Sequence, residues 1–136
     1  MNTEIKVRGY HLDGYQHVNN ARFLEFLEEA RWSYMEQNPG FRDWPKGVSF
    51  FVVNININYR KPAAFGDVLS ISTRLCDIRK KSATIHQDIT NKGTGIVVAD
   101  ADVVFVLVDE KTQKTIPLTG GMYTVLENIA GFHGID

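Results

Sequence analysis

The residues that decide the fold are 19–40, which read NNARFLEFLEEARWSYMEQNPG. Large apolar side chains recur in this stretch at helical spacing and predict a helix over residues 21 to about 37. Asn19 or Asn20 can cap its start, and residues 38–40, Asn-Pro-Gly, end it. The helix is roughly 25 Å long, so a single sheet has to curve around it. Its apolar residues are Phe23, Leu24, Phe26, Leu27, Ala30 and Tyr34, and its polar residues include Glu25, Glu28, Glu29 and Arg31.

Strands are predicted before and after this helix in the sequence, because apolar and polar residues alternate in those segments. The clearest strand covers residues 97–108, in which every second residue from Val97 to Leu107 is apolar. The order is strand, long helix, then four antiparallel strands joined by short turns, which predicts an α+β fold with one helix against one sheet. The predicted strands are residues 3–8, 51–59, 68–78, 83–91, 97–108 and 115–118, with a small helix over 122–129. In the second of these strands, Phe51, Val53, Ile55, Ile57 and Tyr59 are expected to share one face.

Composition limits the classes of function. A chain of 136 residues with 43% hydrophobic content fits one ordered domain, residues 1–136. A net charge of −1 gives no general attraction to nucleic acid or to an anionic membrane, and no apolar run is long enough to span a membrane. Cys76 is the single cysteine, which excludes an internal disulfide and suits a reducing compartment. We therefore expect a cytoplasmic protein without a targeting segment.

Several common catalytic motifs are missing from the sequence. It contains no G-x-S-x-G elbow, no Walker loop, no dinucleotide-binding glycine motif and no H-E-x-x-H zinc motif. The four histidines, His11, His17, His86 and His133, are not spaced as metal ligands on one helical face. Metal binding is therefore not expected.

One carboxylate, Asp13, stands in a loop directly before the long helix. A carboxylate beside the free N–H groups of a helix start can serve acyl transfer, as a base or nucleophile next to a positive helix end. The same arrangement also occurs where an aspartate only caps a helix or shapes a turn. The pattern alone leaves both interpretations open.

The amino-acid sequences of two segments resemble those of a known family. Residues 7–31 read VRGYHLDGYQHVNNARFLEFLEEAR, and residues 58–67 read NYRKPAAFGD. They resemble the N-terminal motif and the Y-R-x-P-A-x-x-G-D junction of the 4-hydroxybenzoyl-CoA thioesterase-like branch of hot-dog proteins. Within that family the first segment is most similar to the long-chain acyl-CoA thioesterases, although the wider family often has glycine in place of Gln16.

The resemblance implies a hot-dog fold, one long helix wrapped by a curved antiparallel sheet, and hydrolysis of acyl-CoA to free acid and CoA. By position, Asp13 takes the place of the catalytic carboxylate, and the backbone N–H of Asn20 takes the place of the donor to the thioester carbonyl. It also implies a homo-oligomer, at least a dimer and further a dimer of dimers, that needs no metal or other cofactor. The residues expected to bind or frame the substrate are His17, Asn19, Tyr59, Arg60 and Lys61.

Several points stay open at the level of sequence. Asp13 can activate a water as general base or attack the thioester itself. The CoA phosphates need cations, which either Arg60 with Lys61 or the 79–81 turn, Arg-Lys-Lys, can supply. The acyl tail needs an apolar slot, for which the candidates Phe23, Phe26, Leu27, Phe51 and Tyr59 can equally be core residues.

Two rival functions remain. A hydratase or dehydratase of acyl thioesters on the same fold would pair Asp13 with His17 or His86. A non-catalytic acyl-CoA binding module is the other, although a pure binder gains little from an unpaired carboxylate beside a thioester.

Overall fold

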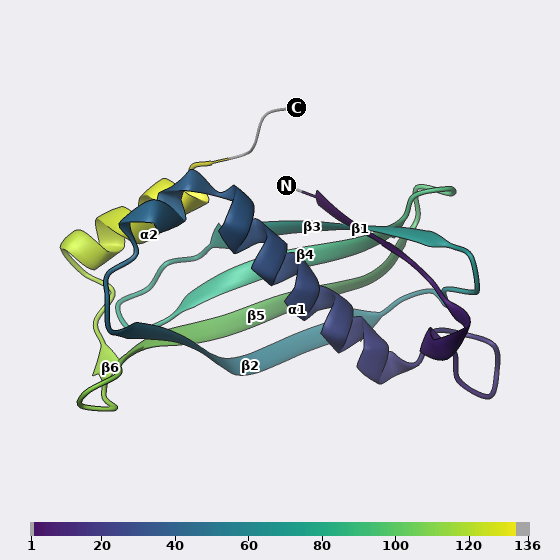
Figure 1. Cartoon of the computed structure of the whole chain (residues 1–136), viewed down its shortest axis with the longest axis horizontal. Helices are drawn as coiled ribbons and strands as arrows, with labels where there is room; N and C mark the ends of the chain where they lie inside the picture. Colours follow the sequence, from purple (N-terminus) through teal and green to yellow (C-terminus); the bar gives the residue numbers. More distant parts are fainter. Residues whose placement is uncertain (1, 133–136) are drawn as a thin grey trace.

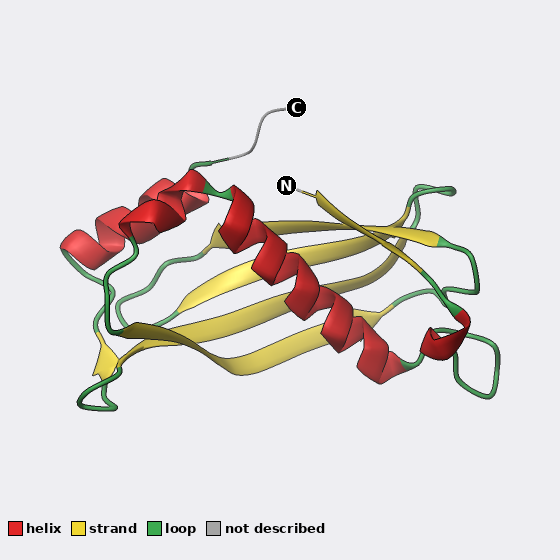
Figure 2. Cartoon of the chain, viewed as in Figure 1, coloured by secondary structure: helices red, strands yellow, loops and turns green. Residues whose placement is uncertain are grey.

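The computed structural model describes residues 2–132 and has one long helix lying across one face of a single sheet (Figures 1 and 2). This arrangement confirms the predicted α+β class. No helix in residues 2–132 is both long and apolar enough to cross a membrane. The elements are, in chain order, β1 (Asn2–Lys6), η1 (Gly9–His11), α1 (Asn20–Gln37), η2 (Pro39–Asp43), β2 (Val48–Tyr59), β3 (Val68–Cys76), β4 (Ala83–Asn91), β5 (Val97–Asp109), β6 (Thr115–Ile116) and α2 (Gly121–Ala130).

The sheet has the strand order β1-β3-β4-β5-β2, all pairs are antiparallel, and β6 pairs with one end of β5. Because β2 pairs with β5 and not with β3, the chain between Tyr59 and Val68 crosses from one edge strand to the other half of the sheet. The predicted turn at residues 65–67 is present, with the N–H of Asp67 donating to the carbonyl of Ala64 at 3.1 Å, but the expectation that a short turn joins two neighbouring strands here was wrong. The crossing brings residues 60–67 beside the loop that precedes α1, where the N–H of Val18 donates to the carbonyl of Ala63 at 2.8 Å.

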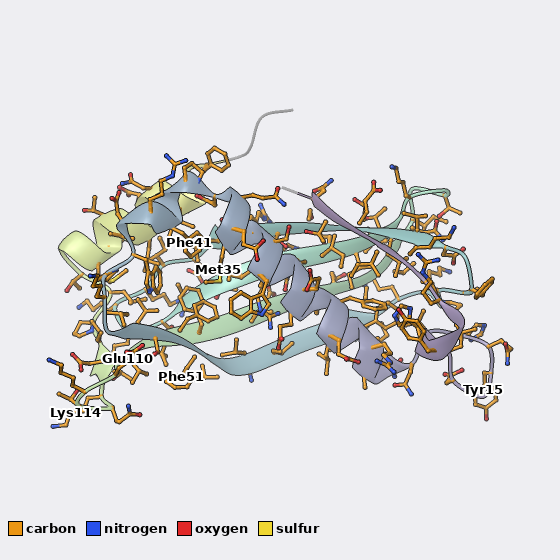
Figure 3. All side chains as sticks on the ribbon, in the orientation of Figure 1. Tyr15, Met35, Phe41, Phe51, Glu110 and Lys114 are labelled. Atoms are coloured by element: carbon orange, nitrogen blue, oxygen red, sulfur yellow. The ribbon has the colours of Figure 1, made fainter. Side chains whose placement is uncertain are left out.

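A β-bulge in β2 changes which residues face the helix. The register of β2 against β5 shifts between Val52 and Asn54, so the alternation of faces is not continuous along the strand. Phe50 lies on the helix side and stacks on Phe105, with ring centroids 4.2 Å apart, whereas Phe51 is 48% exposed (Figure 3). The prediction that Phe51 shares a face with Ile55 was therefore wrong.

The helix buries five of the six predicted apolar residues, Phe23, Phe26, Leu27, Ala30 and Tyr34, and differs from the prediction at two positions. Leu24, expected in the core, is 38% exposed, and Arg31, expected on the polar side, is buried. Arg31 Nη1 donates to Gln87 Oε1 at 3.1 Å, and Gln87 Nε2 donates to the carbonyl of Leu27 and to Thr73 Oγ1, each at 3.0 Å. Burial lowers the pKa of Arg31, and the nearby charge of Glu28 opposes that shift. Helix α1 is thus tied to β3 and β4 through hydrogen bonds inside the core.

Candidate active site

Backbone hydrogen bonds fix the carboxylate of Asp13 in its loop. Asp13 Oδ1 accepts the N–H of Tyr15 at 2.8 Å and that of His17 at 3.2 Å. The N–H of Asp13 donates in turn to the carbonyl of His17 at 2.8 Å. The loop is closed by a bridge between Leu12 and Val18. One carboxylate oxygen is therefore held by the loop, while Oδ2 accepts no hydrogen bond from residues 2–132.

The loop turns at Gln16, whose φ is 66°. This left-handed conformation costs a side-chain-bearing residue free energy that glycine avoids. A glycine at this position would be relaxed, so the chain holds this turn at some cost. Tyr15, 85% exposed, lies beside this turn at the tip of the loop (Figure 3).

The first N–H of α1, that of Asn20, belongs to the pocket wall and has no hydrogen-bond partner among the residues that the structure describes. Asn19 is the N-cap: its Oδ1 accepts the N–H of Ala21 at 2.8 Å, and its carbonyl accepts the N–H of Arg22 at 2.9 Å. No hydrogen bond within residues 2–132 occupies the N–H of Asn20. Because the helix dipole is positive at this end, that N–H is a donor suited to an oxygen that gains negative charge.

The end of β2 forms the other wall of the site. Tyr59 Oη donates to the carbonyl of Asn20 at 3.2 Å, and its ring lies 5.7 Å from that of Phe23. Arg60 forms an ion pair with Asp100, to which Asn58 Nδ2 also donates at 3.0 Å. The hydrogen bond from Arg60 holds the pKa of Asp100 below its ordinary value; burial opposes this shift, and the hydrogen bond from Asn58 adds to it.

These residues enclose a pocket of about 230 Å³. Six of the seven predicted site residues line it, and the exception is Asn19, whose side chain caps the helix. Val18 and Pro62 also line the pocket, and neither carries a chemical group that could have predicted a site role. The predicted residues at the pocket are Asp13, His17, Asn20, Tyr59, Arg60 and Lys61, with Phe23 beside them.

The other candidate residues lie elsewhere. The 79–81 turn joins β3 to β4 at the end of the sheet remote from Tyr59, and Arg79 pairs there with Asp77 at 3.2 Å. Of the two candidate cation groups, only Arg60 with Lys61 adjoins the pocket. Phe26 and Leu27 are buried in the core cluster, and Phe51 is on the outer face.

The three histidines that the structure describes lie in different places and make different contacts. Nδ1 of His11 accepts the N–H of Arg8 at 2.8 Å, and burial and the charge of Arg22 lower the pKa of this buried ring. His86 contacts Asp102 and Asp88 at 2.8 and 3.1 Å on the outer face of the sheet. Burial lowers the pKa of His86, but these two carboxylates outweigh it and raise the pKa overall. Of the three histidines that the structure describes, only His17 therefore adjoins Asp13 in the pocket.

Metal ligands do not gather in the part of the chain that the structure describes, where no three such side chains come together. His133, the fourth histidine, lies outside the described residues. The chemistry available in the pocket is that of one carboxylate, one unpaired helix N–H and flanking cations, an arrangement suited to acyl transfer.

Comparison with known proteins assigns the family. A model of the thioesterase-like superfamily matches residues 7–126. The chain belongs to this superfamily. The match confirms the resemblance inferred from residues 7–31 and 58–67.

Individual relatives agree with the family. The chain is 53% identical over 131 residues to the long-chain acyl-CoA thioesterase FadM of Escherichia coli K12, covering 95% of this chain and 98% of that one. The crystal structure of YbaW, a probable thioesterase from Escherichia coli, aligns with a TM-score of 0.89 at 52% identity, over 96% of this chain and 98% of YbaW. A 1,4-dihydroxy-2-naphthoyl-CoA thioesterase from Synechocystis shares the fold, with a TM-score of 0.76 at 20% identity over 92% and 93% of the two chains. These neighbours confirm the predicted hot-dog fold.

Proposed function

We propose that this chain hydrolyses long-chain acyl-CoA thioesters to free acid and CoA, with Asp13 and the N–H of Asn20 as its catalytic groups. The observation that carries the proposal is that Asp13 and the unpaired first N–H of α1 line the same pocket. The 53% identity to an acyl-CoA thioesterase supports both the reaction and the substrate class.

The N–H of Asn20 polarises the thioester carbonyl. When a nucleophile attacks the carbonyl carbon, the oxygen gains negative charge, and a donor fixed at the positive end of α1 stabilises it. Asn19 holds this donor in place by capping the helix, so its contribution is to position Asn20. Tyr59 supports the same turn from β2 through its hydrogen bond to the carbonyl of Asn20.

Asp13 provides the carboxylate that starts the attack on the carbonyl carbon of the thioester. As general base it takes a proton from a water whose oxygen attacks the carbonyl carbon; the carbon–sulfur bond then breaks and the CoA thiolate leaves. As nucleophile it displaces the thiolate itself and forms a mixed anhydride that water opens. In both routes Oδ1 remains held by the loop N–H groups, and Oδ2 faces the substrate.

Arg60 and Lys61 are the groups we assign to the CoA phosphates. Both line the pocket, and the Arg60 side chain is 54% exposed even while it pairs with Asp100. Lys61 makes no ion pair with any residue from 2 to 132. A mobile ammonium at the pocket mouth is suited to a phosphate that arrives from solvent.

The test measures CoA release with a thiol reagent from acetyl-, octanoyl-, palmitoyl- and benzoyl-CoA. We expect turnover to rise with chain length in the wild type. Asp13→Asn should lower kcat by about 10² to 10⁴, because asparagine keeps the Oδ1 acceptor of the loop but loses the base. Asp102→Asn, a carboxylate on the outer face, is the matched control and should retain activity.

Two outcomes point to the rival functions. Binding of acyl-CoA without release of CoA by a folded protein would leave a binding module as the better account. Turnover of enoyl-CoA, with equal losses in His17→Ala and Asp13→Asn, would favour a hydratase, since His17 lines the same pocket.

A homo-oligomer is part of the proposal. Strand β2 is 12 residues long, and its outer edge pairs with no other strand in the described chain. Phe51 and Val53 on this strand are 48% and 58% exposed, and long apolar edges of this kind pair with other chains. We propose a homodimer along β2. The outer face, with Val104 and Val106 half-buried, is then available for a dimer of dimers.

A cytoplasmic location is also proposed. Its support is Cys76, the single cysteine of the sequence, which is half-buried and unpaired. Burial raises the pKa of its thiol above the ordinary value, so the thiol is less reactive than an exposed one. A free thiol of this kind is typical of proteins in a reducing compartment.

A further inference from the structure

Three loops of the chain lie side by side at one end of the sheet, the right-hand end in Figure 1, and form a surface that we call the loop end. They are residues 8–18, which include η1, residues 60–67 and residues 92–96. The N–H of Gly66 donates to the carbonyl of Val7 at 3.0 Å, which joins the second loop to the start of the first. The N–H of Lys92 donates to the carbonyl of Val68 at 2.8 Å, which joins the third loop to the end of the second.

Each of these loops carries a large apolar side chain that is exposed to solvent. Tyr10 and Tyr15 of the first loop are 71% and 85% exposed. Phe65 of the second loop is 69% exposed, and Ile96 of the third is 49% exposed. Among residues 2–132 no other loop has an exposed apolar side chain of this size. Exposed apolar side chains on loops are therefore confined to the loop end.

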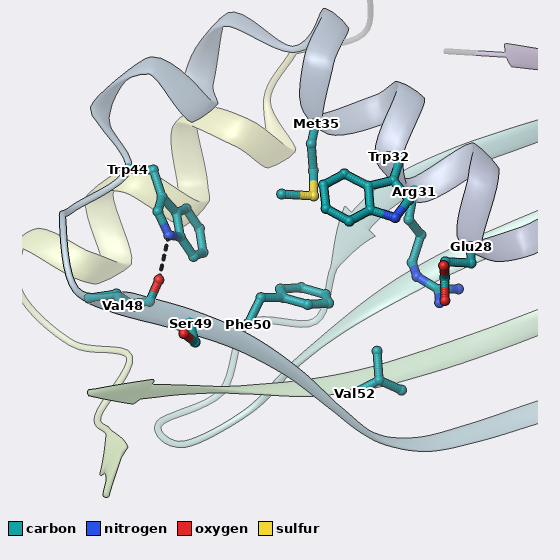
Figure 4. Close-up of a pocket in the computed structure, with 9 residues that line it drawn as sticks. All are labelled: Glu28, Arg31, Trp32, Met35, Trp44, Val48, Ser49, Phe50 and Val52. Atoms are coloured by element: carbon teal, nitrogen blue, oxygen red, sulfur yellow. Dashed lines mark hydrogen bonds between the residues drawn. The ribbon is translucent and has the colours of Figure 1, made fainter. Parts of the chain in front are cut away.

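The other exposed apolar side chains belong to helices and strands. Trp32 and Val52 line the groove between α1 and β2 (Figure 4). Phe51 and Val53 lie on the strand that we assign to the dimer. The side chains of the loop end differ from these because they stand on three separate loops. A protein partner would need a separate pocket for each of them, whereas a fluid surface adapts to all of them at once.

The same loops carry an excess of positive charge. Four cations and two carboxylates give them a net charge of +2 with neutral histidines, whereas that of the whole chain is −1. Arg8 and Lys61 form no ion pair with any residue from 2 to 132. Charge of this sign is complementary to an anionic surface. The charged residues are the cations Arg8, Arg60, Lys61 and Lys92 and the carboxylates Asp13 and Asp67.

We propose that the loop end docks on the surface of an anionic lipid bilayer. Tyr10, Phe65 and Ile96 enter the headgroup layer, and the cations of the three loops lie beside lipid phosphates. Tyrosine suits this position because its ring is apolar and its hydroxyl polar. Docking of this kind combines burial of apolar side chains with attraction between the cations and the anionic lipids.

The choice of a bilayer as the partner rests on the proposed thioesterase function. Two of the three loops also wall the catalytic pocket, through Asp13 and His17 of the first loop and Arg60 and Lys61 of the second. A myristoyl chain binds a bilayer with an association constant of about 10⁴ M⁻¹, and two more methylenes raise this constant to about 10⁵ M⁻¹. Palmitoyl-CoA is therefore held largely in bilayers, and docking brings the catalytic pocket to the surface that holds this substrate.

Cosedimentation with vesicles measures docking without turnover. The wild type should sediment with vesicles of equal parts phosphatidylglycerol and phosphatidylcholine, and much less with phosphatidylcholine alone. Tyr10→Ser combined with Phe65→Ser should weaken binding about tenfold or more, because burial of large apolar side chains is lost. Ile96→Ser tests the third loop independently and should also weaken binding. Tyr123→Ser is the matched control, since this exposed tyrosine is on α2 at the other end of the molecule, and it should bind like the wild type.

A second pair of variants tests the contribution of charge. Arg8→Gln combined with Lys92→Gln should weaken binding to the anionic vesicles at least about fivefold, because one cation beside such a surface contributes roughly that factor. Lys80→Gln combined with Lys81→Gln removes the same charge from the 79–81 turn at the other end of the sheet and should leave binding unchanged. Equal losses in the two variants would show attraction by the whole chain and overturn docking by the loop end.

Sedimentation and turnover separate this inference from the function on which it rests. Wild-type protein that sediments with anionic vesicles but releases no CoA from any thioester would refute the hydrolase and leave the docking surface standing. Wild-type protein that releases CoA but does not sediment with these vesicles would refute the docking surface and leave the hydrolase standing. If the wild type does not sediment and Tyr10→Ser with Phe65→Ser lowers the mass in light scattering, the loop end is a contact between copies of the chain, and the proposal is overturned.

Discussion

A single backbone N–H can be removed from this site without unwinding the helix that carries it. Asn20 is the first residue of α1, the position at which proline is well tolerated in helices. The residue before it, Asn19, has φ −60° and ψ 136°, an extended conformation that a following proline also accepts. Asn20→Pro therefore deletes the proposed oxyanion donor and little else.

We expect Asn20→Pro to lower kcat by about 10² to 10³, the usual effect of losing one oxyanion donor. Asn20→Ala keeps the N–H and is the reference against which the loss is measured. Steady-state kinetics with palmitoyl-CoA give the ratio, and thermal unfolding checks that both variants fold. Equal kcat values for the two variants would assign the carbonyl to another donor.

At the residue scale the sequence predicted most of the residues that line the candidate pocket. The segment that holds Asp13, His17 and Asn20 is contiguous, so its motif is readable without the fold. The sequence also predicted Tyr59, Arg60 and Lys61 as site residues, because they lie in a second contiguous motif. The role of Asn19 could not be predicted, because an asparagine that caps a helix and one that contacts substrate look the same in a sequence.

Among the secondary-structure elements, the link from α1 to β3 and β4 depends on a buried charge. Arg31 donates to Gln87, which is fully buried and donates to Leu27 and Thr73. Removal of the Gln87 amide leaves a guanidinium and a hydroxyl in the core without that partner. Such losses are expensive because the remaining polar groups stay out of water.

Gln87→Leu should lower the free energy of unfolding by about 2 to 4 kcal/mol. Arg31→Met together with Gln87→Leu should cost less than the sum of the single changes, because no charge is then left unpaired. Urea unfolding of the four proteins of the cycle measures this. Gln37→Leu, an exposed glutamine, is the control and should shift the value by no more than about 0.5 kcal/mol. Additive losses would show that Arg31 and Gln87 do not interact.

Elements were predicted well in type and less well in face and pairing. Periodicity identified α1 and the long strands, because one buried side imposes a regular pattern. It did not reveal the bulge near Val52, where one extra residue reverses which side chains of β2 face the helix. It also did not reveal the burial of Arg31, because a charged residue is ordinarily predicted to lie on the surface. The pairing of β2 with β5 also left no local signal, because it depends on contacts between distant parts of the chain.

For the whole molecule, the proposed dimer along β2 can be tested by adding positive charge to this edge strand. Phe51→Lys combined with Val53→Lys places two lysines on the edge strand, and lysine on an edge opposes pairing between chains. Light scattering should give a multiple of the 15.4 kDa chain mass for the wild type and a smaller multiple for this variant. Phe65→Lys with Ile96→Lys is the matched control, since both residues are exposed apolar side chains in loops. A wild-type monomer, or an edge variant of unchanged mass, would contradict the dimer.

The strand order also governs the order of events on the ribosome. Val48 pairs with Asp109 and Tyr59 with Ala99, so each residue of β2 meets its partner only about 40 to 60 residues later in synthesis. At about 5 to 20 residues per second, the strand waits roughly 2 to 12 s before β5 exists. During that interval an apolar segment with both edges open is exposed to chaperones and to neighbouring nascent chains. The yield of folded enzyme should therefore depend on translation rate and temperature as much as on the stability of the finished sheet.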